Sequence, residues 1–188
     1  MANRTLMELA RDGETPPEIE TVARDEGVSV EAIREGLAAG RIVIPANRRH
    51  SNLHPLGIGR VLRTKVNANI GTSSQSGTLS SELHKLRAAL EAGADTVMDL
   101  STGPDAANIR RELLAHCPRP FGTVPVYDAA ATVKDPADLT ADDWLHAIER
   151  HAADGVDFMT VHAGLLRAHI PLARRRLIGI VSRGGGLL

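Results

Sequence analysis

Five short apolar segments of the sequence end in side chains that could bind or react with a small molecule. In chain order these are Asn67 and Asn69, then Asp99, Ser101 and Thr102, then Tyr127 and Asp128, then His162, and finally Ser182 and Arg183. Amide and hydroxyl groups hydrogen-bond polar ligands, and the imidazole of His162 can exchange a proton near neutral pH. Arg183 precedes three glycines, so it offers a cation beside exposed backbone amides, which suits a phosphate or a carboxylate. These residue types indicate a polar pocket that accepts an anion.

The five segments are expected to be strands of one parallel β-sheet. They are apolar on both faces and alternate with stretches of helical periodicity, which is the pattern of βα units. The expected strands are 65–71, 96–103, 120–127, 158–164 and 179–185. The expected helices are 80–93, 105–116 and 141–153, with a helical or irregular segment at 165–176. Because the carboxyl ends of parallel strands face the same side, their polar side chains should converge.

Each of these polar residues also has an ordinary structural explanation. An asparagine near a strand end often caps the next helix, and Asp99 could accept backbone amides of its own turn. His162 could be a core histidine whose hydrogen bonds are satisfied, and the glycines are turn formers first. The functional interpretation therefore depends on the convergence of all five strand ends.

Residues 1–60 are expected to form a small helical segment and a loop ahead of the sheet, which would occupy 61–188. The helical periodicity covers 18–26 and 29–40. Residues 21–37 also have the outline of a helix-turn-helix, in which Glu31 and Arg34 would contact a DNA groove. Four acidic side chains oppose DNA binding, because phosphates would repel them: Asp25, Glu26, Glu31 and Glu35.

Composition narrows the class of protein. Twenty-two Lys and Arg against 23 Asp and Glu give a formal charge of −1, so no basic field attracts nucleic acid or anionic lipid. No apolar run approaches the roughly 20 residues of a membrane span, and a cytoplasmic location is expected. The single cysteine, Cys117, excludes an internal disulfide and any metal site that needs several thiolates. His50 and His54 lie four residues apart in a loop without a third ligand, so we expect exposed histidines and not a zinc site.

The strand-end strings resemble the phosphomethylpyrimidine synthase (ThiC) family of thiamin biosynthesis. The matching strings are IPAN (44–47), KVNANIGTS (65–73), AGADTVMDLSTG (92–103), GTVPVY (122–127), TVHAG (160–164) and GIVSRGG (179–185). The resemblance implies a radical lyase that uses S-adenosylmethionine and a [4Fe–4S] cluster, with zinc, to convert aminoimidazole ribotide into hydroxymethylpyrimidine phosphate. It also implies a homodimer. Its substrate-binding positions fall on Asn69, Met98, Tyr127, His162, Ser182, Arg183 and Gly184.

The resemblance implies a (βα)8 barrel, of which five strands would form a partial TIM-type barrel after the N-terminal helical segment. The metal histidines and the three cluster cysteines of the family have no counterpart here, and Asp128 replaces the usual Gln. We therefore expect an incomplete chain that is inactive alone and lacks its C-terminal half or a complementing chain. Truncation is favoured over a split enzyme. A 5-hydroxybenzimidazole synthase acting on the same substrate, or a non-catalytic half-barrel that binds a ligand or a partner, are the alternatives.

Overall fold

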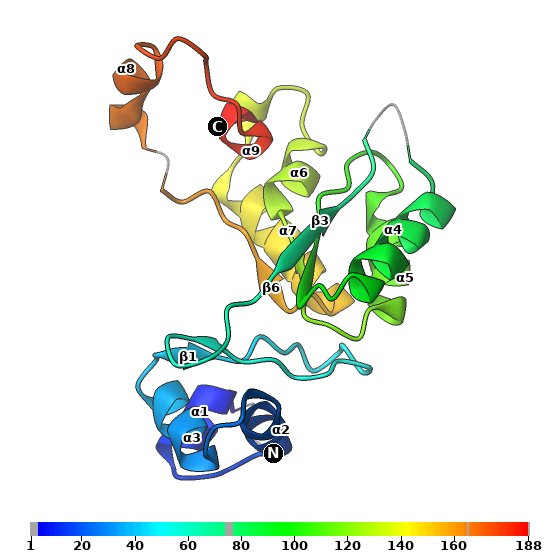
Figure 1. The fold of residues 1–188 in the computed structure, drawn as a ribbon. Coiled ribbons are helices and arrows are strands. Elements are labelled where there is room, and N and C mark those ends of the chain that lie inside the picture. The colour runs from blue at the N-terminus through cyan, green and yellow to red at the C-terminus, as the bar shows by residue number, and fades with distance from the viewer. Residues whose placement is uncertain (1–3, 74–76, 165, 188) are drawn as a thin grey trace.

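A computed structural model describes residues 4–73, 77–164 and 166–187 (Figure 1). The chain begins with three helices, α1 (Leu6–Arg11), α2 (Pro17–Glu26) and α3 (Val30–Ala38). Local signals set their bounds: Thr5 and Glu8 form a capping box, Ser29 caps α3, and Gly27 ends α2 in a left-handed conformation. The two N-terminal helices expected from periodicity are confirmed, and α1 was not predicted.

Two short strands connect this helical unit to the main sheet. β1 (Ile42–Val43) and β2 (Ile58–Gly59) pair antiparallel, and the residues between them form a loop. Beyond β2, Glu26 of α2 binds the chain that leads into the sheet: its carboxylate pairs with Lys65 at 2.7 Å and accepts the backbone N–H of Arg63 at 2.7 Å. The helical unit is thus attached at the amino ends of the sheet strands (Figure 1). The predicted domain boundary between residues 60 and 61 stays a prediction.

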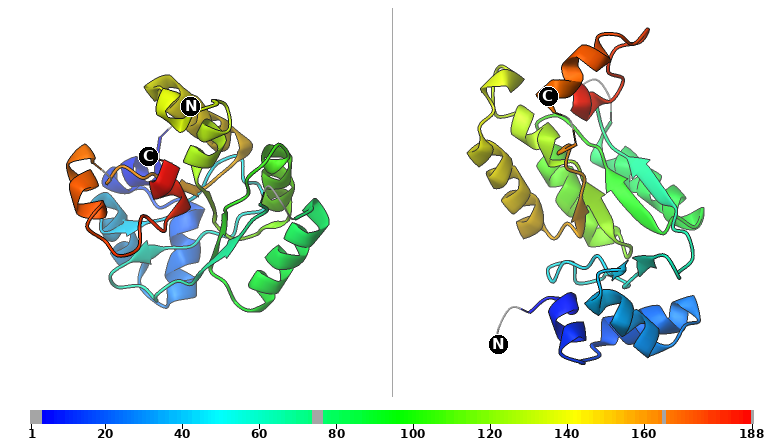
Figure 2. Two further views of the ribbon diagram at one scale, coloured as in Figure 1. Left: turned by 90° about the horizontal axis from the view of Figure 1, so that it is seen from above. Right: turned by 90° about the vertical axis from the view of Figure 1, so that its left-hand side faces the viewer.

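The main sheet has four parallel strands in the order β3, β4, β5, β6. The strands are β3 (Asn67–Ile70), β4 (Thr96–Asp99), β5 (Phe121–Thr123) and β6 (Phe158–Met159), and the helices between them are α4 (Leu79–Glu91), α5 (Ala106–His116), α6 (Pro125–Ala130) and α7 (Ala141–Asp154), with a 3₁₀ turn at Pro136–Asp138. Seen from above, the helices lie outside a curved sheet that does not close (Figure 2). The α/β class and the predicted helices are confirmed.

The hydrophobic core lies between the sheet and its helices. It contains Val97, Phe121, Leu86 and Leu113, each at most 2% exposed. Because side chains alternate along a strand, the residues next to these in sequence point to the opposite, uncovered face of the sheet. The core therefore fixes which strand residues can meet a ligand on that face.

The helix expected at 80–93 begins one residue earlier, at Leu79, and Thr78 caps it by accepting the N–H of Ser81. Two predicted strands are wrong. The expected strand 120–127 ends at Thr123, because Pro125 occupies the first turn of α6, where its missing N–H costs nothing. Tyr127 and Asp128 are consequently helical residues.

The expected fifth strand at 179–185 is also absent from the described residues. The chain after β6 forms a 3₁₀ turn (Arg167–His169), α8 (Ile170–Ala173) and α9 (Arg183–Leu187). Ile180 and Val181 are exposed, and β6 has β5 as its neighbour in the described sheet. A strand is stable only when a neighbour takes its backbone hydrogen bonds, and the glycines after Arg183 add no side chain to pack.

Candidate functional site

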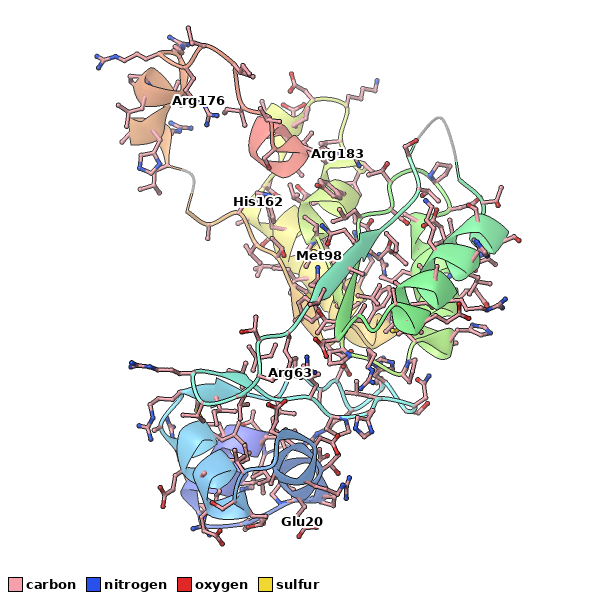
Figure 3. All side chains as sticks on the ribbon, viewed as in Figure 1. Glu20, Arg63, Met98, His162, Arg176 and Arg183 are labelled. Atoms are coloured by element: carbon pink, nitrogen blue, oxygen red, sulfur yellow. The ribbon has the colours of Figure 1, made fainter. Side chains whose placement is uncertain are left out.

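The uncovered face of the sheet brings together residues from three strands or their extensions. Asn69 of β3 lies opposite Met98 of β4 in the parallel register. Thr160, just after β6, donates its hydroxyl to Met98 Sδ at 3.7 Å. Met159 faces the core, and side chains alternate along an extended chain, so Phe158, Thr160 and His162 point to the uncovered face. His162 therefore continues this face toward the carboxyl end of the sheet. Figure 3 shows Met98 and His162 on the side of the sheet that faces α9.

His162 is in close contact with Gly184 of α9. A Cβ atom at Gly184 would collide with the imidazole ring, so only a glycine permits this approach of the helix. His162 Nδ1 is buried and has no hydrogen-bond partner among the described residues. Buried polar atoms in proteins are nearly always paired, so an unpaired buried nitrogen is unusual.

Tyr127 and Arg183 form a second contact at the same end of the molecule. The Arg183 guanidinium lies over the Tyr127 ring, 5.5 Å from its centre, which is the geometry of a cation–π interaction. Ser182 caps α9, because its hydroxyl accepts the N–H of Gly185 at 3.2 Å and its carbonyl accepts that of Gly186 at 2.8 Å. Arg183 itself remains exposed.

The predicted site residues thus form two contact groups joined through one segment. In the first group, Met98 lies opposite Asn69 and contacts Thr160. In the second, Arg183 lies over Tyr127 and Gly184 packs against His162. Thr160 and His162 belong to the same short stretch after β6, so the groups lie at one end of the sheet. Their assignment to a substrate remains a prediction.

Three of the polar strand-end residues are structural. Asp99 shares the core-facing side of β4 with Val97, and its carboxylate accepts the N–H of Ser101 at 2.9 Å. Burial raises the pKa of Asp99, which the hydrogen bonds from Ser101 only partly oppose. Ser101 accepts the N–H of Thr72, and Thr102 bonds Thr72 through main-chain and side-chain groups. These residues hold the loops after β3 and β4.

Sequence reasoning missed a buried charged network behind the sheet. Asp128 Oδ2 lies 2.8 Å from His151 Nε2 and 3.0 Å from Arg110 Nη1. His151 Nδ1 lies 2.7 Å from the Thr123 hydroxyl, and Arg110 also binds Asp154. Burial alone would raise the pKa of Asp128, but the His151 hydrogen bond and the Arg110 charge outweigh it and lower the pKa to about 2.

The expectation of exposed loop histidines is wrong for His50. Its ring nitrogens lie 2.7 Å from Asp157 Oδ2 and 2.7 Å from the Cys117 carbonyl, and its side chain is 1% exposed. His54 is half-exposed and pairs with Asp25 of α2. Burial raises the pKa of the Cys117 thiol to about 11, which makes it a poor nucleophile or ligand. The described residues contain no group of three or more His, Cys, Asp or Glu side chains suited to a metal.

The helix pair considered for DNA binding uses its charges within the chain. Glu26 pairs with Lys65, Asp25 pairs with His54, and Arg34 approaches the Gly13 carbonyl. These contacts attach the pair to the rest of the protein. Among the described residues, no helix has the length and apolar character needed to cross a membrane.

Comparisons with known proteins agree with the resemblance. Residues 5–188 match the family described as the Radical SAM ThiC family. The sequence is 53% identical, over 188 aligned residues, to a phosphomethylpyrimidine synthase of Desulforudis audaxviator (strain MP104C). The alignment covers 97% of this chain and 44% of that protein, so the chain spans less than half the length of this relative. This chain belongs to the Radical SAM ThiC family.

Proposed function

We propose that this chain binds aminoimidazole ribotide at the carboxyl end of its parallel sheet and forms the substrate-binding part of a phosphomethylpyrimidine synthase. The complete reaction is a radical rearrangement, classed as a carbon–carbon lyase reaction, that yields hydroxymethylpyrimidine phosphate. The name of the relative at 53% identity supports the activity.

One observation carries the substrate assignment. Residues far apart in the sequence that the family resemblance assigns to the substrate lie at one end of the sheet: Gly184 packs against His162, and Arg183 lies over Tyr127. Met98 and Asn69 lie on the same uncovered face, reached from the His162 segment through Thr160. Random placement of binding residues would not produce these contacts.

The side chains suit the chemical groups of this ligand. The Arg183 guanidinium can bind a phosphate, and Ser182 fixes the turn that presents it. Asn69 and the Tyr127 hydroxyl can hydrogen-bond an imidazole or a ribose, with Met98 as an adaptable apolar wall. His162 Nδ1, buried without a partner among the described residues, can take a hydrogen bond to the ligand.

The open sheet is consistent with a partial (βα)8 barrel. The helices α4, α5 and α7 cover the outer face, and the outer edges of β3 and β6 have no strand partner among the described residues. Closure of a barrel pairs such edges and encloses the uncovered face. We propose that this happens in the longer proteins of the family.

Membership of a radical SAM family implies S-adenosylmethionine and an iron–sulfur cluster. The residues of this chain do not fit the cluster: the one cysteine, Cys117, is buried and donates its thiol to the Arg119 carbonyl. We propose that the cluster, a zinc ion and the contacts of a homodimer belong to the part of the longer relatives that this chain does not span. A cytoplasmic location is part of the same proposal.

Calorimetric titration with aminoimidazole ribotide tests the substrate assignment. We expect saturable binding, weakened about tenfold or more by Arg183→Ala, because a charge-assisted hydrogen bond is worth about 1.5–3 kcal/mol. His162→Ala should also weaken binding. Arg41→Ala, which removes an exposed arginine beside β1, is the matched control and should leave affinity unchanged. No binding by the unmodified chain, or equal affinity in all variants, would contradict the proposal.

A further inference from the structure

Three polar side chains on the uncovered face of β3 and β4 form a short hydrogen-bonded series. The Thr96 hydroxyl donates to Asn67 Oδ1 at 2.8 Å, and Asn67 Nδ2 donates to Asn69 Oδ1 at 2.8 Å. Thr96 and Asn67 lie opposite each other in the parallel register, so the backbone holds them in reach. Thr96 is buried, which fixes the first member of the series in place.

These hydrogen bonds fix the orientation of the Asn69 side-chain amide, that is, which way its oxygen and its Nδ2 group point. A carboxamide has an accepting end and a donating end of nearly equal shape, and its partners decide which way it points. The bond from Asn67 holds the oxygen of Asn69 on the Asn67 side, so its Nδ2 group is the end that points away from Asn67. That group has no hydrogen-bond partner among the described residues.

We propose that Thr96 and Asn67 are positioning residues that make Asn69 a hydrogen-bond donor toward the substrate. The inference rests on the proposed function for the identity of the ligand, and it adds that the site selects a hydrogen-bond acceptor at this point. Such acceptors are an unprotonated imidazole nitrogen or a sugar or phosphate oxygen. A ligand that carries only a donor there would leave two donors facing each other.

Substitution at Asn67 can reverse the direction of the series. Asn67→Asp replaces the amide with a carboxylate, which accepts only and would draw the Nδ2 group of Asn69 toward itself. Asn69 would then present its oxygen to the ligand. Thr96→Val removes the first donor with little change of shape, and Thr96→Ser restores the hydroxyl. Asn52→Asp makes the same chemical change on an exposed loop at the other end of the sheet and serves as the control.

The direction of the amide can be measured without any ligand. Proton exchange of the side-chain amides, followed by NMR in the unmodified chain, should be about fivefold slower at Asn67 than at Asn69, the size of effect expected for one net hydrogen bond. Asn67→Asp should protect Asn69 instead, and Thr96→Val, unlike Thr96→Ser, should reduce the protection of Asn67. Equal exchange, or a more protected Asn69 in the unmodified chain, would overturn the inference.

Titration with aminoimidazole ribotide then tests the selectivity. We expect Asn67→Asp to weaken binding about tenfold and Asn52→Asp to leave it unchanged, with both variants folded at the temperature of the titration. Unchanged affinity in Asn67→Asp would overturn the inference while leaving the proposed function intact. Failure of the unmodified chain to bind would contradict the proposed function alone, since the exchange measurement still decides the direction of the amide.

Discussion

Asp128 stabilises the fold through its charge. Its carboxylate accepts hydrogen bonds from His151 and Arg110. Its pKa falls from 3.8 to about 2, so the stabilisation is complete above about pH 4 and is lost as the pH falls toward 2. Asp128→Asn should lower the free energy of unfolding near neutral pH by about 2 kcal/mol, since one pKa unit corresponds to about 1.4 kcal/mol.

Urea denaturation near pH 7 and near pH 3 checks this prediction. The difference between Asp128→Asn and the unmodified chain should shrink at the lower pH. Asp138→Asn, an exposed aspartate in the 3₁₀ turn before α7, is the control and should show neither effect. A constant difference at both pH values would rule out the charge as the cause.

His50 should make stability depend on pH in the opposite direction. Its burial alone would lower its pKa, but the hydrogen bond and charge of Asp157 outweigh burial and raise the pKa above 6.5. A raised pKa stabilises the folded state below the unfolded value, and that contribution disappears as the pH rises through the folded value. The unmodified chain should therefore lose more stability than His50→Gln between about pH 6 and about pH 9.

Thermal melts across this range measure the effect. His84→Gln changes an exposed histidine of α4 and should retain the pH dependence of the unmodified chain. Identical pH profiles for His50→Gln and the unmodified chain would show that the His50–Asp157 pair does not titrate between the two states.

At the scale of elements, α9 must approach the sheet closely for the site to form. Gly184→Ala would place a methyl group against the His162 ring, whereas a Cβ at Gly186 has open space around it. We expect Gly184→Ala to weaken binding of aminoimidazole ribotide at least tenfold, because it displaces the Arg183 guanidinium together with α9. Gly186→Ala, a matched change two residues away, should have little effect; equal losses would contradict the contact.

The helices were predictable because their signals are local. Glycines, prolines and capping side chains mark their ends, and the apolar stripe marks their inner face, so α2, α3, α4, α5 and α7 agree with the prediction within a few residues. The absence of a strand at 179–185 was not predictable from the sequence. Strand formation depends on a partner strand, which the segment itself does not specify. The end of β5 could have been predicted from Pro125, which favours the first turn of a helix.

Residue spacing predicted part of the site. The 29 residues between Asn69 and Met98 are one βα repeat, and the parallel register places the two opposite each other. For Asp99 the structural alternative is confirmed, because its carboxylate accepts the N–H of Ser101, and its alternation with Val97 points it toward the helices. Arg110 and His151 meet Asp128 only through tertiary packing, and the position of His151 one turn after the buried Ala147 was the one available signal.

At the scale of the whole molecule, the chain contains the proposed binding residues but not the several cysteines that an iron–sulfur cluster takes. A [4Fe–4S] cluster of this kind takes several protein thiolates, and the sequence has one cysteine. The purified 188-residue chain should therefore form no 5′-deoxyadenosine from S-adenosylmethionine after cluster reconstitution. Chromatographic detection of that product, above the level of a reconstitution mixture without protein, would contradict this expectation.

The central claim is that one end of the sheet forms a single ligand site. NMR of the isotope-labelled chain during titration with aminoimidazole ribotide tests it most directly. We expect the largest shifts at the backbone amides of Asn69, Met98, His162 and Gly184, with α1, α2 and α3 unchanged. Shifts concentrated in the N-terminal helices, or no shifts at all, would contradict it.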